Sequence, residues 1–427
     1  MVETRSPAPV EKPVVLTIAG SDSGGGAGIQ ADLKTIEAIG GFGTSAITAV
    51  TAQNTTGVES SHLLSIDEID AQIDAVRSDF DVRAVKTGML ATAEIVERVA
   101  EHAADFECPI VVDPVMVAAS GDRLLTEAAE SAYDELIAES SLVTPNADEA
   151  AVLTGVEPTD EASAREAGRD LLDSGAEAAL IKGGHISGPS VLDTLVLPDT
   201  VETMRHPRIE TDATHGSGCT LSAAIATRLA RGAPLERAVT RATAFMQRAV
   251  RYHHAAGNGP GAVHHLVDVR NAAVRTDAID AVYDAVDRLG METTDTDPVE
   301  AVAVATPYAE TSDDVAAIEG NVESTESGAS VDGRVRFGRS MRPVRTLLDA
   351  READPGVRIA VECRRESAIE AVVESPEWQV VDVDGTADDD HPVPRTASVP
   401  VAVRWGEDDP SISLLASHLD SIVAVWD

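Results

Sequence analysis

The sequence predicts an α/β protein: a central, mainly parallel sheet with helices on both faces, followed by a smaller α/β C-terminal domain. Apolar β-branched runs alternate with amphipathic helical stretches from residue 13 to about residue 268. Strands that are apolar on both faces and separated by helices are typical of a covered parallel sheet. At 427 residues the chain is too long for one ordinary hydrophobic core, which favours two domains.

The predicted strands are short apolar runs bounded by glycine, proline or polar residues. In chain order they cover residues 13–19, 42–50, 82–88, 109–116, 141–146 and 178–184. Amphipathic patterns predict helices at 66–80 and 93–106. Because open α/β sheets bind ligands beyond the carboxyl ends of their strands, the residues that follow these runs are the candidates for a site.

The composition changes near METTDTDPVE (291–300), a polar connector without periodicity. This predicts a polar tail at 1–12, a main domain at 13–268, a helix and acidic linker at 269–301, and a second domain at 302–427. Within the second domain, ESTESGASVDG (323–333) is expected to form a flexible loop.

The chain is strongly acidic, with 33 Lys and Arg against 73 Asp and Glu and a net charge of −40. Its only lysines are Lys12, Lys34, Lys86 and Lys182. Such a charge repels nucleic acids and anionic membranes, so we expect neither as a partner. A lysine-poor acidic surface favours adaptation to high salt, where charge repulsion is screened, over an ordinary acidic protein.

Three widely separated cysteines, Cys108, Cys219 and Cys363, indicate a reducing compartment rather than a disulfide framework or a metal site. We find neither a signal peptide nor a long apolar span in the sequence, so we expect a soluble, cytoplasmic protein.

The stretch ATHGSGCTL (213–221) predicts an anion site, because a glycine-rich turn opens directly into an apolar helix. Free backbone N–H groups and the positive end of the helix dipole then point at the same place. The amides of Gly216, Ser217 and Gly218 are the expected donors, and Cys219 stands at the edge of this turn.

Polar residues follow several of the predicted strands. Asp113 lies at a strand tip, as a candidate for Mg²⁺ or proton transfer or, equally, for a cap or salt bridge. Asn146 and Glu149 share one face of a starting helix, where capping alone or capping with metal or phosphate contact explains them. Lys182 lies before two glycines, a position that favours phosphate binding.

A first glycine-rich loop, AGSDSGGGAGIQADLKT (19–35), follows the first predicted strand and allows a ligand to approach the backbone. Its pattern lacks the G-K-[ST] end of a Walker loop. Taken alone, it is equally well explained as a tight turn.

Together with AQNTTGV, KTGML, DPVM, TPNADEA, KGGH, THGSGCTLSAA and GNGPGAVHH, this loop resembles the hydroxymethylpyrimidine/phosphomethylpyrimidine kinases of the ribokinase-like superfamily. The resemblance covers residues 13–268 and implies a ribokinase-like sheet. It also implies two transfers from ATP, which make the pyrimidine monophosphate and then the pyrophosphate for thiamine synthesis.

The resemblance assigns roles to individual residues. Gln53 can pair with an aminopyrimidine edge through two complementary hydrogen bonds, as a carboxamide pairs with adenine. The pyrimidine site would comprise Gly20, Asp32, Thr51, Gln53 and Met89. Lys182, Asn146, Thr214 and His215 would bind ATP phosphates, and Asp113 and Glu149 would serve Mg²⁺. For His215, shaping the turn is at least as good an explanation.

Cys219 stands where ribokinase relatives have the aspartate that takes the alcohol proton, and the pyrimidine-kinase branch has cysteine there. We expect the helix N-terminus to lower its pKa so that it can act as the base. A neutral thiol would also admit a phosphate monoester, which a permanent carboxylate would repel. The alternative is a buried structural cysteine.

The C-terminal region is similar to the thiamine-phosphate synthase domain that follows this kinase in archaea. Ser340-Met341 replaces the expected Ser-His, the family's phosphate-binding segment is missing, and the domain has no lysine. Arginines of this domain remain candidates to bind phosphate: Arg334, Arg336, Arg339, Arg342 and Arg345. We therefore expect a degenerate, non-catalytic domain, a binding, regulatory or scaffolding remnant with thiamine phosphate as its candidate ligand, in a protein from a halophilic archaeon.

Two other functions fit the sequence less well. Some relatives are pyridoxal kinases, and a thiamine-phosphate-binding regulator with a vestigial kinase is a third hypothesis. A homodimer is the expected assembly.

Overall fold

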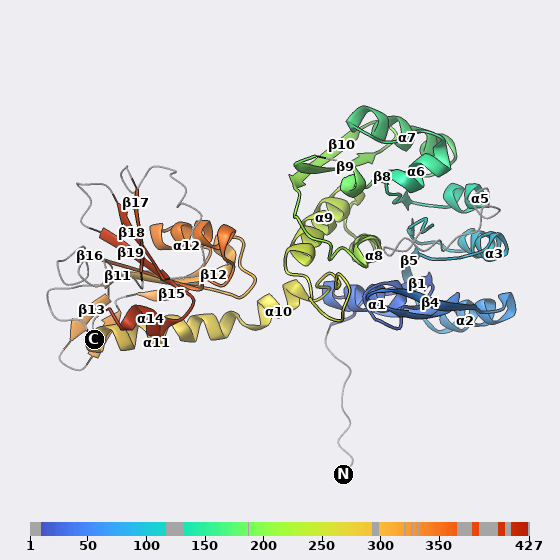
Figure 1. Ribbon diagram of the computed structural model, residues 1–427. Coiled ribbons are helices and arrows are strands. Elements are labelled where there is room, and N and C mark those ends of the chain that lie inside the picture. Colours follow the sequence, from blue (N-terminus) through green and yellow to red (C-terminus); the bar gives the residue numbers. More distant parts are fainter. Residues whose placement is uncertain are drawn as a thin grey trace, which may run out of the picture. The chain divides into compact units, whose positions relative to one another are not determined.

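The computed structural model describes residues 10–116, 132–186, 188–292, 299–319, 322–325, 328–331, 333–364, 378–383, 400–405 and 411–425. The chain divides into two compact units, Met1–Val267 and Asp268–Asp427 (Figure 1). Each unit has its own sheet and its own hydrophobic core.

Unit 1 is built on a sheet whose described strands follow the order β10-β9-β8-β7-β6-β5-β1-β2. These strands are β1 Val14–Ala19, β2 Phe42–Ile47, β5 Val82–Thr87, β6 Ile110–Val112, β7 Leu142–Val143, β8 Ala179–Ile181, β9 Ser190–Val196 and β10 Val201–Pro207. Pairing is parallel from β2 to β8, and antiparallel where β9 joins β8 and β10. The expected mainly parallel sheet is confirmed.

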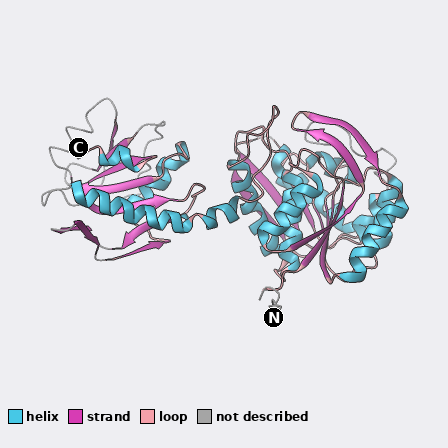
Figure 2. Ribbon diagram, turned by 90° about the horizontal axis from the view of Figure 1, so that it is seen from below, coloured by secondary structure: helices cyan, strands magenta, loops and turns pink. Residues whose placement is uncertain are grey.

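Helices cover both faces of this sheet, as Figure 2 shows. One face carries α1 Gly28–Ile39, α8 Ser217–Ala230 and α9 Leu235–Arg251, with α8 packed on α1, α9 and β5. The other carries α2 Ile66–Asp79, α3 Ala93–Ala103, α5 Tyr133–Ala138, α6 Ala147–Thr154 and α7 Glu161–Asp173.

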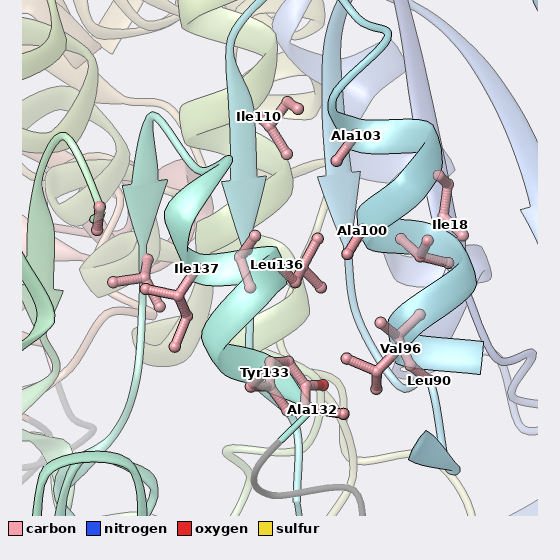
Figure 3. Packing of buried hydrophobic residues seen from close by; sticks show 14 of the residues in the cluster. Ile18, Leu90, Val96, Ala100, Ala103, Ile110, Ala132, Tyr133, Leu136 and Ile137 are labelled. Atoms are coloured by element: carbon pink, nitrogen blue, oxygen red, sulfur yellow. The ribbon is translucent and has the colours of Figure 1, made fainter. Parts of the chain in front are cut away.

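The second of these faces holds a large continuous core. Figure 3 shows Val96 and Ala100 of α3 facing Tyr133 and Leu136 of α5, with Ile110 of the sheet beside them. All five side chains are almost or fully buried. Burial of apolar side chains on this scale stabilises a sheet whose strands would be unstable alone.

The predicted strand 42–50 is in fact two strands in different sheets. The chain leaves the main sheet at Thr48, whose amide donates to the Ala19 carbonyl and whose hydroxyl donates to the Met89 carbonyl. A separate antiparallel hairpin, β3 Ala49–Asn54 and β4 Gly57–Leu63, follows. This turn places β3 beside the carboxyl end of β1.

Unit 2 is a seven-stranded sheet among its described residues, with the order β15-β12-β11-β16-β19-β18-β17. Its strands are β11 Val299–Ala305, β12 Val315–Glu319, β15 Arg334–Phe337, β16 Ile359–Arg364, β17 Gln379–Val383, β18 Val401–Trp405 and β19 Ser411–Ala416. Pairing is antiparallel apart from β17 with β18. One face packs against α11 Arg275–Glu292 and α14 Leu419–Val423, and the other against α12 Arg342–Ala353.

The boundary region contains helices α10 Val267–Ala273 and α11, and the buried face of α11 belongs to the core of unit 2. Residues 293–298 of the predicted linker and 1–9 of the predicted tail lie outside the described residues. The expected loop at 323–333 is wrong, because β13 Val322–Thr325 and β14 Gly328–Val331 pair there as an antiparallel hairpin. In the described ranges we find no helix with the length and apolar character that crossing a bilayer requires.

Candidate active site

The carboxyl ends of the parallel strands bring the predicted polar residues to one edge of the sheet. Gly20 follows β1, Asp113 follows β6 and Lys182 follows β8. Asn146 and Lys182 form a parallel β-bridge just beyond β7 and β8. The site is therefore a product of strand topology, since these residues are far apart in the chain.

Asp22 organises the first glycine-rich loop. Its carboxylate accepts hydrogen bonds from the amides of Gly24 (2.8 Å), Gly26 (3.0 Å) and Ala27 (2.7 Å). Burial favours the neutral acid, but hydrogen bonds from His215 and from the loop amides lower the pKa of Asp22 below its ordinary value. The carboxylate is thus a structural centre of the loop.

His215 joins this loop to the second glycine-rich turn. Its Nε2 lies 3.1 Å from Oδ2 of Asp22 and 3.4 Å from Nε2 of Gln53. The predicted role in shaping the turn therefore has a clear partner in the structure, whereas a contact of His215 with phosphate remains a prediction.

The same two loops meet at Gly216, which has a left-handed backbone with φ of 81°. A methyl group at Gly216 would lie 1.8 Å from the carbonyl oxygen of Gly26. No residue with a Cβ fits this contact, and the left-handed conformation favours glycine independently.

Helix α8 begins at Ser217 without a side-chain cap, and its first turn faces the polar edge. The Ser217 amide donates to the Thr214 carbonyl at 3.0 Å, so one donor of the predicted anion site is already used inside the turn. A methyl group at Gly218 would lie 3.4 Å from Nζ of Lys182 and 3.5 Å from Oδ2 of Asp113. The helix N-terminus and the Lys182 ammonium thus adjoin each other.

Lys182 is held between two carboxylates. Its Nζ lies 2.9 Å from Oδ1 of Asp113 and 3.7 Å from Oε2 of Glu149. Burial would lower the pKa of Lys182, but the two carboxylates raise it above the ordinary value, so the ammonium stays charged. Burial raises the pKa of Glu149.

Asn146 caps helix α6. Its side chain accepts from the Glu149 amide at 2.8 Å, and the Glu149 carboxylate accepts from the Asn146 amide at 2.8 Å. This reciprocal pair is a capping box, which satisfies two amides that the helix leaves free. The capping explanation of Asn146 is confirmed, and its contact with ATP stays a prediction.

The carboxylates suit Mg²⁺ as a pair. Mg²⁺ usually binds one or two protein carboxylates and completes its octahedron with water and substrate phosphates. Among the residues that the structure describes, Oδ2 of Asp113 accepts one long hydrogen bond, at 3.3 Å from the Ser222 hydroxyl. Within the described ranges we find no cluster of three or more His, Cys, Asp or Glu that could hold an ion. Asp113 and Glu149 therefore fit an ion shared with phosphate rather than one caged by protein.

Cys219 is the third residue of α8 and is partly buried. Burial raises the pKa of its thiol to about 11, although Lys86 and the Gly28 amide act in the opposite direction. The expected lowering of this pKa is therefore not found, because loss of solvation, together with Asp32 and Asp113, outweighs Lys86 and the Gly28 amide. At neutral pH this sulfur carries a proton.

The predicted pyrimidine residues lie at the end of β1, with one exception. The Gly20 amide donates to the Met89 carbonyl at 3.2 Å, and a methyl group at Gly20 would lie 2.3 Å from Cε of Met89. The Thr51 hydroxyl donates to the Ser21 carbonyl at 2.8 Å. Gln53 is half-buried beside these residues.

Asp32 is the exception. It is fully buried, and both carboxylate oxygens contact Nζ of Lys86, at 3.0 and 2.9 Å. The Thr17 hydroxyl donates to Oδ2 at 2.6 Å. Its carboxylate is occupied by Lys86 and Thr17 and has no exposed surface, and a contact of Asp32 with the pyrimidine ring stays a prediction.

Lys86 is the functional candidate that the sequence analysis missed. It is one of four lysines in the chain and lies in an apolar strand, at a position that a solvated lysine rarely occupies. That combination is a signal that could have identified it.

In unit 2, Arg342 begins helix α12 directly after Met341. Its Nη1 lies 2.7 Å from Oε1 of Glu362, and its guanidinium lies 5.5 Å from the ring centroid of Trp405. One of the arginines expected to bind phosphate is therefore engaged with a carboxylate and an aromatic ring.

Comparison with known proteins identifies two families along the chain. Residues 22–264 match the family model described as phosphomethylpyrimidine kinase, and residues 299–406 match the model of thiamine-phosphate synthase ThiN. A hydroxymethylpyrimidine/phosphomethylpyrimidine kinase of Streptomyces coelicolor is 48% identical over 258 residues, covering 60% of this chain and 96% of that protein.

Two solved structures resemble unit 1. A phosphomethylpyrimidine kinase of Clostridium difficile has 40% identity and a TM-score of 0.51, covering 56% of this chain and all of that chain. A pyridoxal kinase of Staphylococcus aureus in complex with ADP has 32% identity and a TM-score of 0.58, covering 61% and 96%. The chain belongs to the phosphomethylpyrimidine kinase family, with a ThiN domain after its kinase domain.

Proposed function

We propose that this protein uses ATP to phosphorylate 4-amino-5-hydroxymethyl-2-methylpyrimidine to its monophosphate and then to its pyrophosphate, in thiamine biosynthesis. The observation that carries the proposal is the arrangement of Cys219 at the N-terminus of α8, directly beyond Gly218, which adjoins Lys182 and Asp113. The kinase relatives named above support the same reaction class.

The pyrimidine ring would lie at the end of β1. There the Gln53 carboxamide offers a donor and an acceptor to the amino group and ring nitrogen. The walls of this pyrimidine site would be Gly20, Thr51 and Met89, since Met89 bonds to Gly20 and Thr51 bonds to the adjacent Ser21. Asp32 supports this region from below.

ATP would place its phosphates between α8 and the Lys182 ammonium. The pyridoxal kinase relative was solved in complex with ADP, which supports a nucleotide as a ligand of this chain. Mg²⁺, held by Asp113 and Glu149, would neutralise charge that develops on the phosphate oxygens. We propose Asn146, Thr214 and His215 as secondary phosphate contacts, because Asn146 forms a β-bridge with Lys182 and the other two residues directly precede α8.

In the first transfer, the oxygen of the substrate hydroxyl attacks the γ-phosphorus of ATP. At the same time the Cys219 sulfur accepts the proton of that hydroxyl. The bond from that phosphorus to the β–γ bridging oxygen breaks, and ADP leaves. The helix N-terminus stabilises charge on the moving phosphoryl group. The base form is the thiolate, which at neutral pH is a small fraction because the pKa lies near 11.

The second transfer explains a thiol at this position. A phosphate monoester dianion must enter beside residue 219, and a neutral thiol does not repel it as a carboxylate would. Replacing Cys219 by Asp should therefore slow phosphorylation of the monophosphate more than that of the alcohol. An unchanged ratio of the two rates would contradict this explanation.

A pyridoxal kinase activity is the second candidate, because the structural neighbour from Staphylococcus aureus is a pyridoxal kinase. A coupled ADP-release assay with the pyrimidine alcohol, its monophosphate and pyridoxal distinguishes the two. Turnover with both pyrimidines supports the main proposal, and turnover with pyridoxal alone replaces it. Absence of turnover with all three, together with tight thiamine phosphate binding, indicates a regulator.

For unit 2 we propose a non-catalytic domain that binds thiamine phosphate. The Arg342–Glu362 pair against Trp405 supports a structural role for that arginine. All three tryptophans of the chain, Trp378, Trp405 and Trp426, belong to this unit, the last of them outside the described residues. Quenching of tryptophan fluorescence by thiamine phosphate therefore reports binding by unit 2.

We further propose a cytoplasmic homodimer adapted to high salt. The net charge of −40 supports the salt adaptation, and three cysteines that form no disulfide support a reducing compartment. Phe42, Val50 and Leu63 are 44%, 48% and 41% exposed, on edge strand β2 and on the β3–β4 hairpin. Such apolar exposure supports an interface there, which light scattering at several salt concentrations tests.

A further inference from the structure

Lys86 and Asp32 form an ion pair that is sealed from solvent. Both side chains are 0% exposed, and Nζ lies 2.9 and 3.0 Å from the two carboxylate oxygens. Burial would lower the pKa of Lys86, but the Asp32 carboxylate raises it above its ordinary value. Burial also raises the pKa of Asp32, against the Lys86 ammonium and the Thr17 hydroxyl. Because both carboxylate oxygens contact Nζ and one also accepts from Thr17, we treat the pair as an ammonium and a carboxylate with no net charge.

Space for this ammonium is provided by Gly88. A methyl group there would lie 2.8 Å from Nζ of Lys86 and 3.0 Å from Cβ of Ala19. Removing two charges from water costs about as much as their attraction returns, and apolar side chains of the same volume are often as stable. Stability alone does not account for this pair.

The pair lies on two elements that pack against the helix of Cys219. Asp32 is on α1 and Lys86 is on β5, and both elements pack against α8, which carries the cysteine. Lys86 and Cys219 interact electrostatically, and the Gly28 amide at the start of α1 donates to the sulfur. The charges that act on this thiol come from Lys86, Asp32, Asp113 and Lys182.

We propose that Lys86 is a positioning residue that, with Asp32, sets the charge on the Cys219 sulfur. This inference rests on the proposed function, in which that sulfur accepts the substrate proton. At rest, Asp32 balances the ammonium and the sulfur remains a thiol. When the thiolate forms, the same ammonium is the buried cation that stabilises it, while Lys182 is left to the phosphates.

The proposal predicts that neutralising Asp32 and neutralising Lys86 change the thiolate fraction of Cys219 in opposite directions. Asp32→Asn removes the balancing anion and keeps the cation, so the thiolate is favoured. Lys86→Met removes the cation and keeps the anion, so the thiolate is disfavoured. If the pair were purely structural, both variants would change the reactivity of Cys219 in the same direction, because either substitution would loosen the packing and expose the sulfur.

The experiment measures alkylation of Cys219 by iodoacetamide in the full chain, without ATP or pyrimidine, from pH 7 to pH 10. Peptide mass spectrometry separates the cysteines. Cys108 is the matched internal control, because burial also raises the pKa of its thiol to about 11, with Asp81 and Arg83 rather than the pair beside it. Its rate should not change.

At pH 8 we expect alkylation of Cys219 about tenfold faster in Asp32→Asn and about tenfold slower in Lys86→Met, since an opposite charge nearby moves a pKa by about 1 unit or more. Changes of the same sign, or no change in either variant, overturn the proposal. If Cys108 is also alkylated faster in a variant, that variant is unfolding.

Should a single variant unfold, the double variant Lys86→Met/Asp32→Leu removes both charges and leaves no lone buried ion. Because the ammonium acts on the sulfur more strongly than the carboxylate does, Cys219 should react more slowly than in wild type. Faster reaction overturns the proposal. The alkylation experiment contains no substrate, so it tests the pair independently of kinase activity. If the two variants change the alkylation rate in opposite directions but the protein shows no kinase turnover, the proposed function is rejected and the role of the pair stands.

Discussion

Two lysine–aspartate pairs occur at the carboxyl ends of parallel strands, and they differ in depth. Lys182 and Asp113 approach to 2.9 Å, and the lysine side chain is 14% exposed. Lys86 and Asp32 approach to the same 2.9 Å with no exposure. The same chemical pair can therefore serve a ligand when it reaches the surface, and can act only on protein groups when it does not.

The largest expected effect follows from breaking the buried pair. Lys86→Met leaves Asp32 alone in the core, which should cost about 3–5 kcal/mol of unfolding free energy. Urea denaturation measures it, with Lys12→Met as the control. Lys12 pairs with Glu37 at 2.6 Å, but both side chains are nearly half exposed, so its loss should change stability by less than about 1 kcal/mol. Equal losses in the two variants would contradict the contrast.

Breaking the pair that reaches the surface, Lys182 with Asp113, should lower the kinase activity. Lys182→Met is expected to lower kcat/KM about 10²–10³-fold, as removal of one preorganised donor to a developing charge does. It also leaves Asp113 and Glu149 without their cation, so Mg²⁺ should raise the melting temperature of this variant. Mg²⁺ should leave the melting temperature of Lys86→Met unchanged. A Lys182→Met enzyme with full activity would remove Lys182 from the site.

The smallest effect concerns pH and the thiol between the two lysines. Burial raises the pKa of Cys219 to about 11, and the base form is the unprotonated one. The rate should therefore rise with pH, about tenfold per unit, until the pH reaches that pKa. A steady-state pH series measures it, and Cys219→Ser should abolish the slope. A plateau below pH 8 would show a different base.

The sequence predicted the parallel sheet because its strands are buried on both faces and so appear as uninterrupted apolar runs. It failed at Thr48, where the run 42–50 continues but the chain changes sheets. That change depends on hydrogen bonds to Ala19 and Met89, which come from distant parts of the chain. A local pattern does not contain them.

The same limit separates the two lysines. Lys182 precedes Gly-Gly and Lys86 precedes Thr-Gly at the ends of similar apolar runs, and only one was singled out. The contact of Asp113 with Lys182 could be predicted, because both residues follow strands whose carboxyl ends lie at one edge of the sheet. The depth of Asp32, and with it the raised pKa of Cys219, depends on how α1, β5 and α8 pack together.

The contact between Gly216 and Gly26 has a consequence for how two ligands affect each other's binding. The first glycine-rich loop, which holds Gly26, lies against the turn before α8, which holds Gly216, and Nε2 of His215 lies 3.1 Å from Asp22 and 3.4 Å from Gln53. Ordering one of these two loops therefore restricts the other. If the pyrimidine binds at the first loop and phosphate at the second, as we propose, the first ligand leaves less conformational entropy for the second to remove, and each ligand should tighten the binding of the other without any change of shape.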